Sequence, residues 1–111
     1  MKKFLVLYAS SVSASEQMEG ATPEQMKAGM DAWKSWAKKA GPAVVDLGTP
    51  LGNTRRVTPD GASMTNSNVS GFSILQAESA EAVTKLLQSH PHFMAPGAAI
   101  EVVECMPMPG M

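Results

Sequence analysis

The sequence has little cysteine, few aromatic residues and almost no net charge, and each shortage removes a class of protein. A single cysteine, Cys105, excludes an internal disulfide framework and any zinc site built on several cysteines. A formal net charge of −1 gives no basic surface for nucleic acid, so none is expected as a partner. Hydrophobic residues make up 44% and charged residues 17%, which is typical of a globular chain that is neither disordered nor membrane-embedded.

The 111 residues fit one domain, predicted to span residues 1–111. Lys2 and Lys3 followed by apolar residues imitate a secretory signal. However, the apolar segment Phe4–Ala9 is shorter than the roughly 7–15 residues that a signal core needs. Its β-branched and aromatic content favours a buried strand instead. A cytoplasmic location is therefore expected, in which Cys105 stays reduced.

Hydrophobic patterning predicts four strands and two helices, joined by loops that are rich in Gly, Pro, Ser and Asn. The first loop, Ser10–Ala21, shows no periodicity. A second, Thr49–Asn68, contains the turn sequence Pro59-Asp60-Gly61 and a candidate short strand at Arg55–Val57. In chain order the predicted elements are strand Phe4–Ala9, helix Pro23–Ala40, strand Ala43–Leu47, strand Gly71–Ala77, a helix after Ser79 that ends before Pro91, and strand Ala98–Met106.

The first helix carries the clearest local signals. Thr22 is a predicted N-cap, Pro23 suits the first helical position, and Gln25 completes a capping box. An apolar stripe then follows the helical period. Its members are Met26, Met30, Trp33, Ala37 and Ala40. The stripe predicts that Trp33 and the two methionines face the core, whereas Trp36, beside the stripe, either packs or lines a pocket.

The order β-α-β-loop-β-α-β predicts an α+β fold: a ferredoxin-like βαββαβ domain with a four-stranded antiparallel sheet and two helices on one face. In the strand Phe4–Ala9 both alternating faces are apolar, so the face without helices needs a cover. A symmetric second copy is the economical cover. The protein is therefore expected to pair with a second copy of itself as a homodimer.

Several segments, in this order and spacing, resemble the YCII-related proteins, in particular the DGPF-domain branch. They are Lys3–Tyr8, Met26–Trp36, Asp46-Leu47-Gly48, Gly71-Phe72-Ser73-Ile74, Ala80-Glu81-Ala82, His90-Pro91-His92 and Ile100-Glu101-Val102. The resemblance implies ferredoxin-like subunits that pair as a dimeric α+β barrel. It also implies small-molecule binding with lactone-type acid/base chemistry, as in relatives that resemble lactone-processing dehalogenases.

The sequence departs from those relatives where they carry a proposed His–Asp pair. That histidine belongs to the first helix, where this chain has Met26 and Met30 and no histidine. The aspartate belongs to an Asp-Pro step after the second helix, where this chain has His90-Pro91. The pair does not carry over at either position, which puts enzyme activity by that route in doubt.

His90, His92 and Asp46 are the candidate catalytic residues. Imidazole titrates near neutral pH and binds metals, so the histidines suit acid/base work or ligation. The alternative is a solvated loop in which a cationic His90 complements a helix C-terminus. At most one histidine is expected to face a cleft between the helices and the sheet, with the other in solvent. Asp46 either points into that cleft or caps a turn before Gly48.

Trp36, Tyr8 and Arg55 are the candidate ligand-binding residues. Arg55 suits a carboxylate or phosphate, and Tyr8 with the methionines suits an adaptable apolar pocket. Cys105 is predicted to be a small buried residue. No cofactor and no metal are expected. Two functions remain open: small-molecule binding, with or without catalysis, and a non-catalytic regulatory or assembly module that acts through its dimer face.

Overall fold

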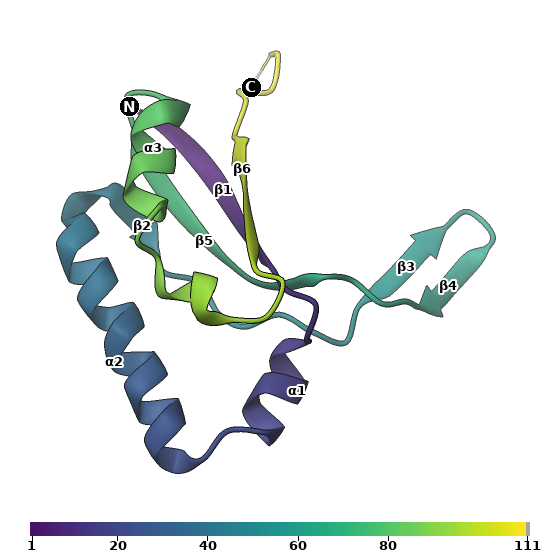
Figure 1. The fold of residues 1–111 in the computed structure, drawn as a ribbon. Coiled ribbons are helices and arrows are strands. Elements are labelled where there is room, and N and C mark those ends of the chain that lie inside the picture. Colours follow the sequence, from purple (N-terminus) through teal and green to yellow (C-terminus); the bar gives the residue numbers. More distant parts are fainter. Residues whose placement is uncertain (111) are drawn as a thin grey trace.

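The computed structural model describes residues 1–110, with the side chains of Ala14 and Ser15 left aside. Met111, the last residue of the predicted domain, lies outside the described residues. The described residues form a mixed α+β structure of six strands, three α-helices and two 3₁₀ turns, η1 and η2 (Figure 1). In chain order these are β1 Lys2–Ala9, α1 Ala14–Glu19, α2 Pro23–Ala40, η1 Gly41–Ala43, β2 Val44–Asp46, β3 Arg55–Thr58, β4 Gly61–Met64, β5 Val69–Ala77, α3 Ala80–Leu87, η2 Pro91–Met94 and β6 Ala99–Glu104.

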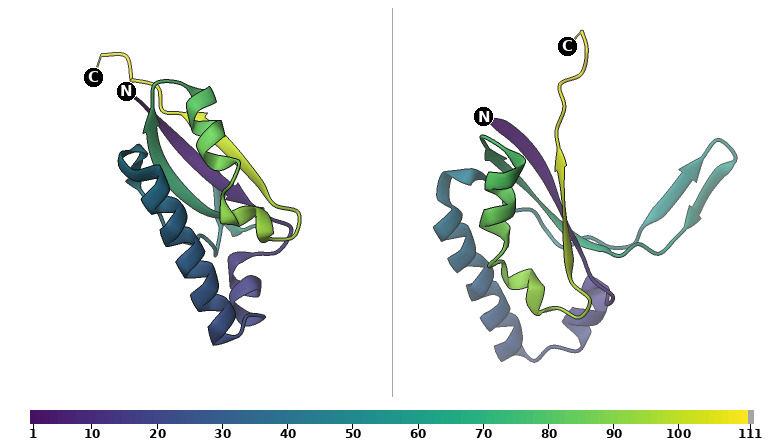
Figure 2. Two further views of the ribbon diagram at one scale, coloured as in Figure 1. Left: turned by 60° about the vertical axis from the view of Figure 1, so that its left-hand side comes forward. Right: turned by 45° about the horizontal axis from the view of Figure 1, so that its top comes forward.

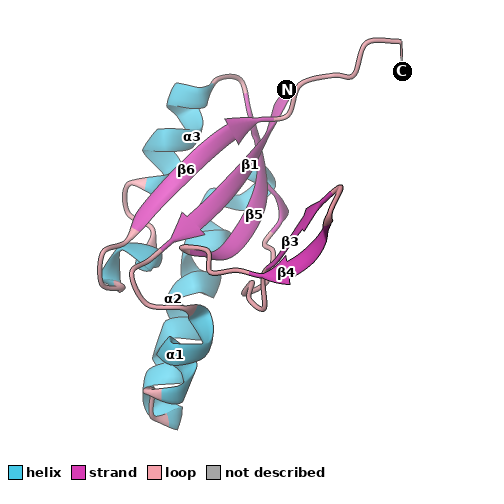
Figure 3. Cartoon of the chain, turned by 90° about the vertical axis from the view of Figure 1, so that its right-hand side faces the viewer, coloured by secondary structure: helices cyan, strands magenta, loops and turns pink. Residues whose placement is uncertain are grey.

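Four strands form one antiparallel sheet in the order β2-β5-β1-β6. Phe4 lies opposite Leu75 and Val6 opposite Ser73, so the buried residues of β1 and β5 share one face. Helices α2 and α3 cover that face (Figure 3). The core there consists of Phe4, Val6, Tyr8, Leu75, Ala77, Trp36, Ala40, Val83 and Leu87. The alternation expected in β5 and the placement of the two helices on one face are confirmed.

The other face of the sheet is here called the open face, because no helix within residues 1–110 lies over it (Figure 3). Leu5 and Leu7 of β1 lie opposite Ile74 and Phe72 of β5 on this face. All four side chains are only partly buried. Val103 and Glu101 of β6, which pair with Leu5 and Leu7, extend it and are exposed. The open face is therefore an apolar surface that also carries Lys3 of β1 and Glu101 of β6.

The sequence predicts the helix starts well and the first loop poorly. Thr22 and Gln25 form the expected capping box, and Ser79 accepts from the backbone N–H of Ala82. The segment predicted as a loop over residues 10–21 instead contains α1, capped by Ser13, which accepts from the backbone N–H of Glu16. A helix of six residues is too short to show a period, so the pattern missed it.

The buried face of α2 also differs from the prediction. Trp36 and Ala40 are its buried residues, whereas Trp33 is half-buried. The N-terminal half of α2 extends past the sheet (Figure 1), so Met26 and Met30 are exposed. The assignment of these methionines to the core was wrong because the stripe extends beyond the sheet that would bury it. Cys105, predicted to be buried, is exposed just after β6 ends.

Candidate functional site

Both histidines lie at the start of η2, and the local sequence determines their geometry. His90 is the N-cap residue with an extended backbone, as the following Pro91 requires. The backbone N–H of His92 donates to Nδ1 of His90 over 2.9 Å. Nδ1 is therefore an acceptor and carries no proton. In the neutral ring the proton lies on Nε2.

His92 attaches this turn to the end of the first strand. Its Nε2 lies 2.7 Å from the backbone oxygen of Ala9, and because a carbonyl only accepts, this nitrogen donates. The ring is buried and lies 5.2 Å, centroid to centroid, from that of Tyr8. The expectation that one of the two histidines lies in solvent was wrong. Residues distant in sequence cover both rings.

His90 is enclosed by three aromatic side chains. Its ring centroid lies 4.4 Å from those of both Trp33 and Trp36, and 4.8 Å from that of Tyr8. The residue is 2% exposed. Burial, with a smaller contribution from the nearby His92, lowers the pKa of His90 to about 4. At neutral pH the ring is therefore an uncharged donor, which argues against the alternative of a cationic His90 at a helix end.

Nε2 of His90 is buried and has no hydrogen-bond partner among residues 1–110. A buried donor without a partner costs free energy, on the order of 1–3 kcal/mol. His90 also lines a pocket of about 380 Å³ between α2 and η2, here called the α2–η2 pocket. The pocket is lined by Ala32, Ser35, Trp36 and Lys39 of α2 and by Ser89, His90, Pro91 and Met94. An unpaired donor beside a cavity of this size is suited to a ligand that accepts a hydrogen bond.

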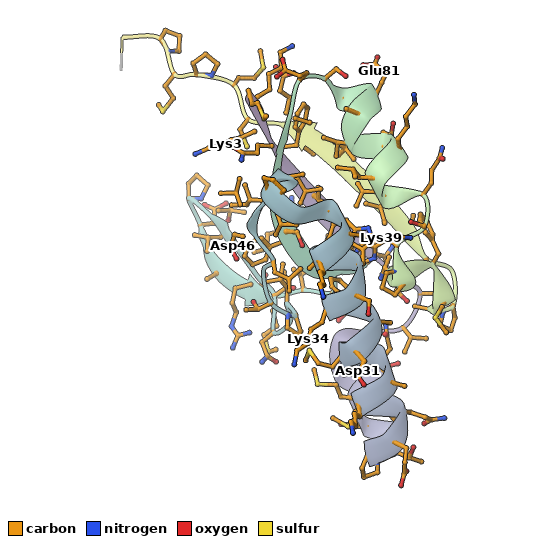
Figure 4. All side chains as sticks on the ribbon, turned by 90° about the vertical axis from the view of Figure 1, so that its left-hand side faces the viewer. Lys3, Asp31, Lys34, Lys39, Asp46 and Glu81 are labelled. Carbon is orange, nitrogen blue, oxygen red and sulfur yellow. The ribbon has the colours of Figure 1, made fainter. Side chains whose placement is uncertain are left out.

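The lining of this pocket combines apolar side chains with polar and charged ones. The indole N–H of Trp36 donates to the carbonyl of Leu86, so the indole supplies a fixed apolar surface. Lys39 lies on the side of α2 turned toward η2, whereas Lys34 lies on the other side (Figure 4). The pocket can thus offer an ammonium group, the hydroxyls of Ser35 and Ser89, and the imidazole of His90.

Tyr8 supports the site from the sheet side. Its hydroxyl donates to Ser73 over 2.8 Å, and the Ser73 hydroxyl donates to the carbonyl of Leu47 over 2.6 Å. Burial raises the pKa of the Tyr8 hydroxyl, opposed by the hydrogen bond with Ser73. Tyr8 therefore holds its ring against both histidines and does not itself line the α2–η2 pocket.

Asp46 and Arg55 lie elsewhere. Asp46 is exposed, and its carboxylate accepts from the backbone N–H of Gly48 over 2.8 Å, which is the turn role foreseen as the alternative. It lies on the opposite side of α2 from Lys39 (Figure 4). Arg55 is on β3, where its guanidinium donates to the carbonyl of Asn53. Neither residue joins the histidines.

The sequence identified Trp36, a candidate ligand-binding residue that lines the α2–η2 pocket, but missed Ser35, Lys39 and Ser89. Lys39 lies three residues after Trp36 and four after Ser35, so the helical period was the signal for Lys39 and Ser35. Ser89 is adjacent to His90. Trp33 was assigned to the core, yet it contacts His90. The expected cleft against the sheet is instead a pocket between a helix and a turn.

No protein-family model matches this chain, and no curated protein matches it. In residues 1–110, no three or more His, Cys, Asp and Glu side chains gather as a metal ion would require. Within the same residues, no helix has the length and apolar character needed to cross a membrane. These findings define the protein only as an α+β structure with a pocket to which the buried His90 contributes.

Proposed function

We propose that this protein binds a small molecule with a hydrogen-bond acceptor in the α2–η2 pocket, and that it is a YCII-related protein of the DGPF branch. The observation that carries the binding site is that His90, whose buried Nε2 has no hydrogen-bond partner among residues 1–110, belongs to the lining of a cavity of about 380 Å³. The ligand's acceptor, a carbonyl or carboxylate oxygen, takes the hydrogen bond that the protein leaves unmade. Lys39 at the rim favours an acidic ligand.

Binding is better supported than acid/base catalysis. A general base is most effective when its pKa lies near the working pH, and the pKa of His90 is held near 4. His92 already donates through Nε2 to Ala9, and Asp46 is on the other side of α2. A neutral imidazole donor can still polarise a carbonyl, as lactone-type chemistry would need. His90 supplies that donor, and the residues that line the pocket with it include no carboxylate to act as a base.

The binding proposal is tested by titrating a panel of small carboxylates, amides and lactones into ¹⁵N-labelled protein at pH 7. The expected result is saturable movement of the Trp36 indole resonance and of neighbours of His90. His90→Asn, which keeps an acceptor for the His92 N–H, should weaken that response, whereas Asp46→Asn should not change it. A panel in which every member leaves these resonances in place contradicts the proposal.

The proposal extends to the architecture: a ferredoxin-like βαββαβ domain that pairs with a second copy as a dimeric α+β barrel in the cytoplasm. The strand order β2-β5-β1-β6, with β3 and β4 set apart as an insertion, supports the topology. The apolar open face supports the pairing, since monomers rarely leave such a patch in water. Light scattering at micromolar concentration should give about twice the mass of one chain.

A second function remains, a regulatory or assembly module that acts through the open face. A groove of about 470 Å³ on that face favours it. The ¹⁵N titration distinguishes the two functions. Ligand-induced shifts confined to the open face, with the Trp36 indole unchanged, would favour assembly over the α2–η2 pocket.

A further inference from the structure

The β3–β4 hairpin is the least covered element of the molecule. Every residue of both strands is exposed, and the two strands form a sheet of their own. The hairpin projects beyond the open face, on the side opposite α2 and α3 (Figures 1 and 2). An isolated two-stranded hairpin is marginally stable in water. A contact outside the chain would therefore stabilise it.

The pairing of β3 and β4 gives the hairpin one apolar and one polar face. Arg55 lies opposite Met64 and Val57 opposite Ala62, and directly opposed residues share a face. The other face carries Arg56, Thr58 and Ser63. Val57 is 76% exposed and Met64 68% exposed, so none of the described residues 1–110 covers the apolar face.

The open face offers a matching surface beside the base of the hairpin. A groove of about 470 Å³, here called the open-face groove, crosses it. It is lined by Leu7, Ala9, Ser10, Ser11, Ser67, Asn68, Val69, Gly97, Ala99 and Glu101. Within residues 1–110 the side-chain ion pair is that of Lys2 with Glu104, at 3.7 Å. Glu101 therefore has no cationic partner among these residues.

We propose that the β3–β4 hairpin is a clasp that closes on a second copy of this chain. Its Val57–Ala62–Met64 face lies in the open-face groove of the other copy, and its Arg55 pairs with Glu101 of that copy. The inference rests on the proposed homodimer and specifies which element holds it. In a two-fold pair each hairpin clasps the other copy, so the contact is made twice.

Charge complementarity points to a copy of the same chain as the occupant. The hairpin face is apolar with one cation, and the groove combines apolar side chains with serines, one asparagine and one anion, Glu101. Lys3 is a cation on the open face itself, four residues before Leu7, which is about 13 Å along the strand. Arg55 of the other copy and Lys3 are therefore alternative partners for Glu101, and charge-reversal variants distinguish them.

The apolar contact is tested by sedimentation of the full-length protein over a range of concentrations. Val57→Asp with Met64→Asp should weaken the dimer at least about tenfold, as the loss of a buried interface anchor does. Thr58→Asp with Ser63→Asp adds the same charge to the other hairpin face and should leave the dissociation constant unchanged. Equal weakening by both pairs, or by neither, overturns the clasp.

The ion pair is tested by charge reversal at low salt. Arg55→Glu and Glu101→Arg should each weaken the dimer, and the double variant should restore it. Arg56→Glu, on the polar face, is the control and should have no effect. Rescue of Glu101→Arg by Lys3→Glu instead of Arg55→Glu overturns the clasp.

Two outcomes distinguish this inference from the proposal on which it rests. A dimer that forms as tightly with every hairpin variant as with the wild type overturns the clasp and leaves the homodimer standing. A wild-type chain that sediments as a monomer at high micromolar concentration overturns both. Neither result bears on ligand binding in the α2–η2 pocket, because its lining residues include none from β3 or β4.

Discussion

The backbone N–H of His92 donates to Nδ1 of His90 over 2.9 Å, and this bond assigns the proton of the neutral His90 ring to Nε2. Protonation of His90 would place a second proton on Nδ1 and break the bond. It would also put a charge among Tyr8, Trp33 and Trp36. Burial and the nearby His92 lower the pKa of His90, and the geometry of this hydrogen bond opposes the charged form in the same direction.

The first prediction is that stability falls between pH 6.5 and 4. The pKa of His90 is about 4 in the folded chain and about 6.5 when unfolded, so in this range the unfolded chain binds more protons. The part of the free energy of unfolding that is linked to the low pKa of His90 is fully present above pH 6.5. It is lost as the pH falls toward 4, up to about 3 kcal/mol. Denaturant midpoints at pH 7 and pH 5 measure it. His90→Asn should lose less stability over this interval, and an equal loss in both proteins contradicts the assignment.

The second prediction concerns the Tyr8–Ser73–Leu47 chain of hydrogen bonds. Ser73→Ala leaves the buried Tyr8 hydroxyl and the Leu47 carbonyl without partners, at a cost of about 2–4 kcal/mol. Tyr8→Phe keeps the Ser73 bond to Leu47 and should cost about 1 kcal/mol. The double variant removes the orphaned hydroxyl, so it should be no less stable than Ser73→Ala alone. Chemical denaturation measures all three, and additive costs would argue against the chain.

Local signals of the sequence predicted much of the fold. The cap residues Thr22 and Ser79 mark helix starts because their side chains bond to N–H groups three residues away. The alternation in β5 assigns Leu75 to the core and Ile74 to the open face because strand side chains alternate. These inferences needed only neighbouring residues, and they are confirmed.

The site depended on contacts that no local pattern contains. His90 is buried by Tyr8, Trp33 and Trp36, all more than fifty residues earlier in the chain. The helical stripe gave the direction of each side chain about the helix axis but not how α2 lies across the sheet. It therefore favoured Trp33 over Trp36 for the core, whereas the structure buries Trp36. The candidate histidines were identified, but their burial and protonation were not.

The third prediction ranks three substitutions along α2. Trp36 is buried, and its indole donates to the Leu86 carbonyl, so Trp36→Ala should cost about 3–5 kcal/mol. Trp33→Ala, at a half-buried position, should cost less. Lys34→Ala, on an exposed side, should stay within about 0.5 kcal/mol. Thermal or urea unfolding gives the order, and a larger loss from Trp33→Ala than from Trp36→Ala contradicts the described helix face.

The last prediction concerns two glycines in the segment after β2. Gly48 has a φ of +82°, and a Cβ placed on it would lie 1.7 Å from the carbonyl oxygen of Phe72. Because that atom belongs to the backbone of β5, the strand itself would have to move. Gly48→Ala should therefore lower the free energy of unfolding by about 3 kcal/mol or more, since the costs of positive φ and of steric overlap add.

Gly52 is the matched control. It has no positive φ and has open space where alanine would place its methyl group, so Gly52→Ala should change stability by less than about 0.5 kcal/mol. Matched unfolding curves of the two variants measure the difference. Equal midpoints would mean that the turn after β2 does not press against β5, and the position of Asp46 beside it would then have to be revised.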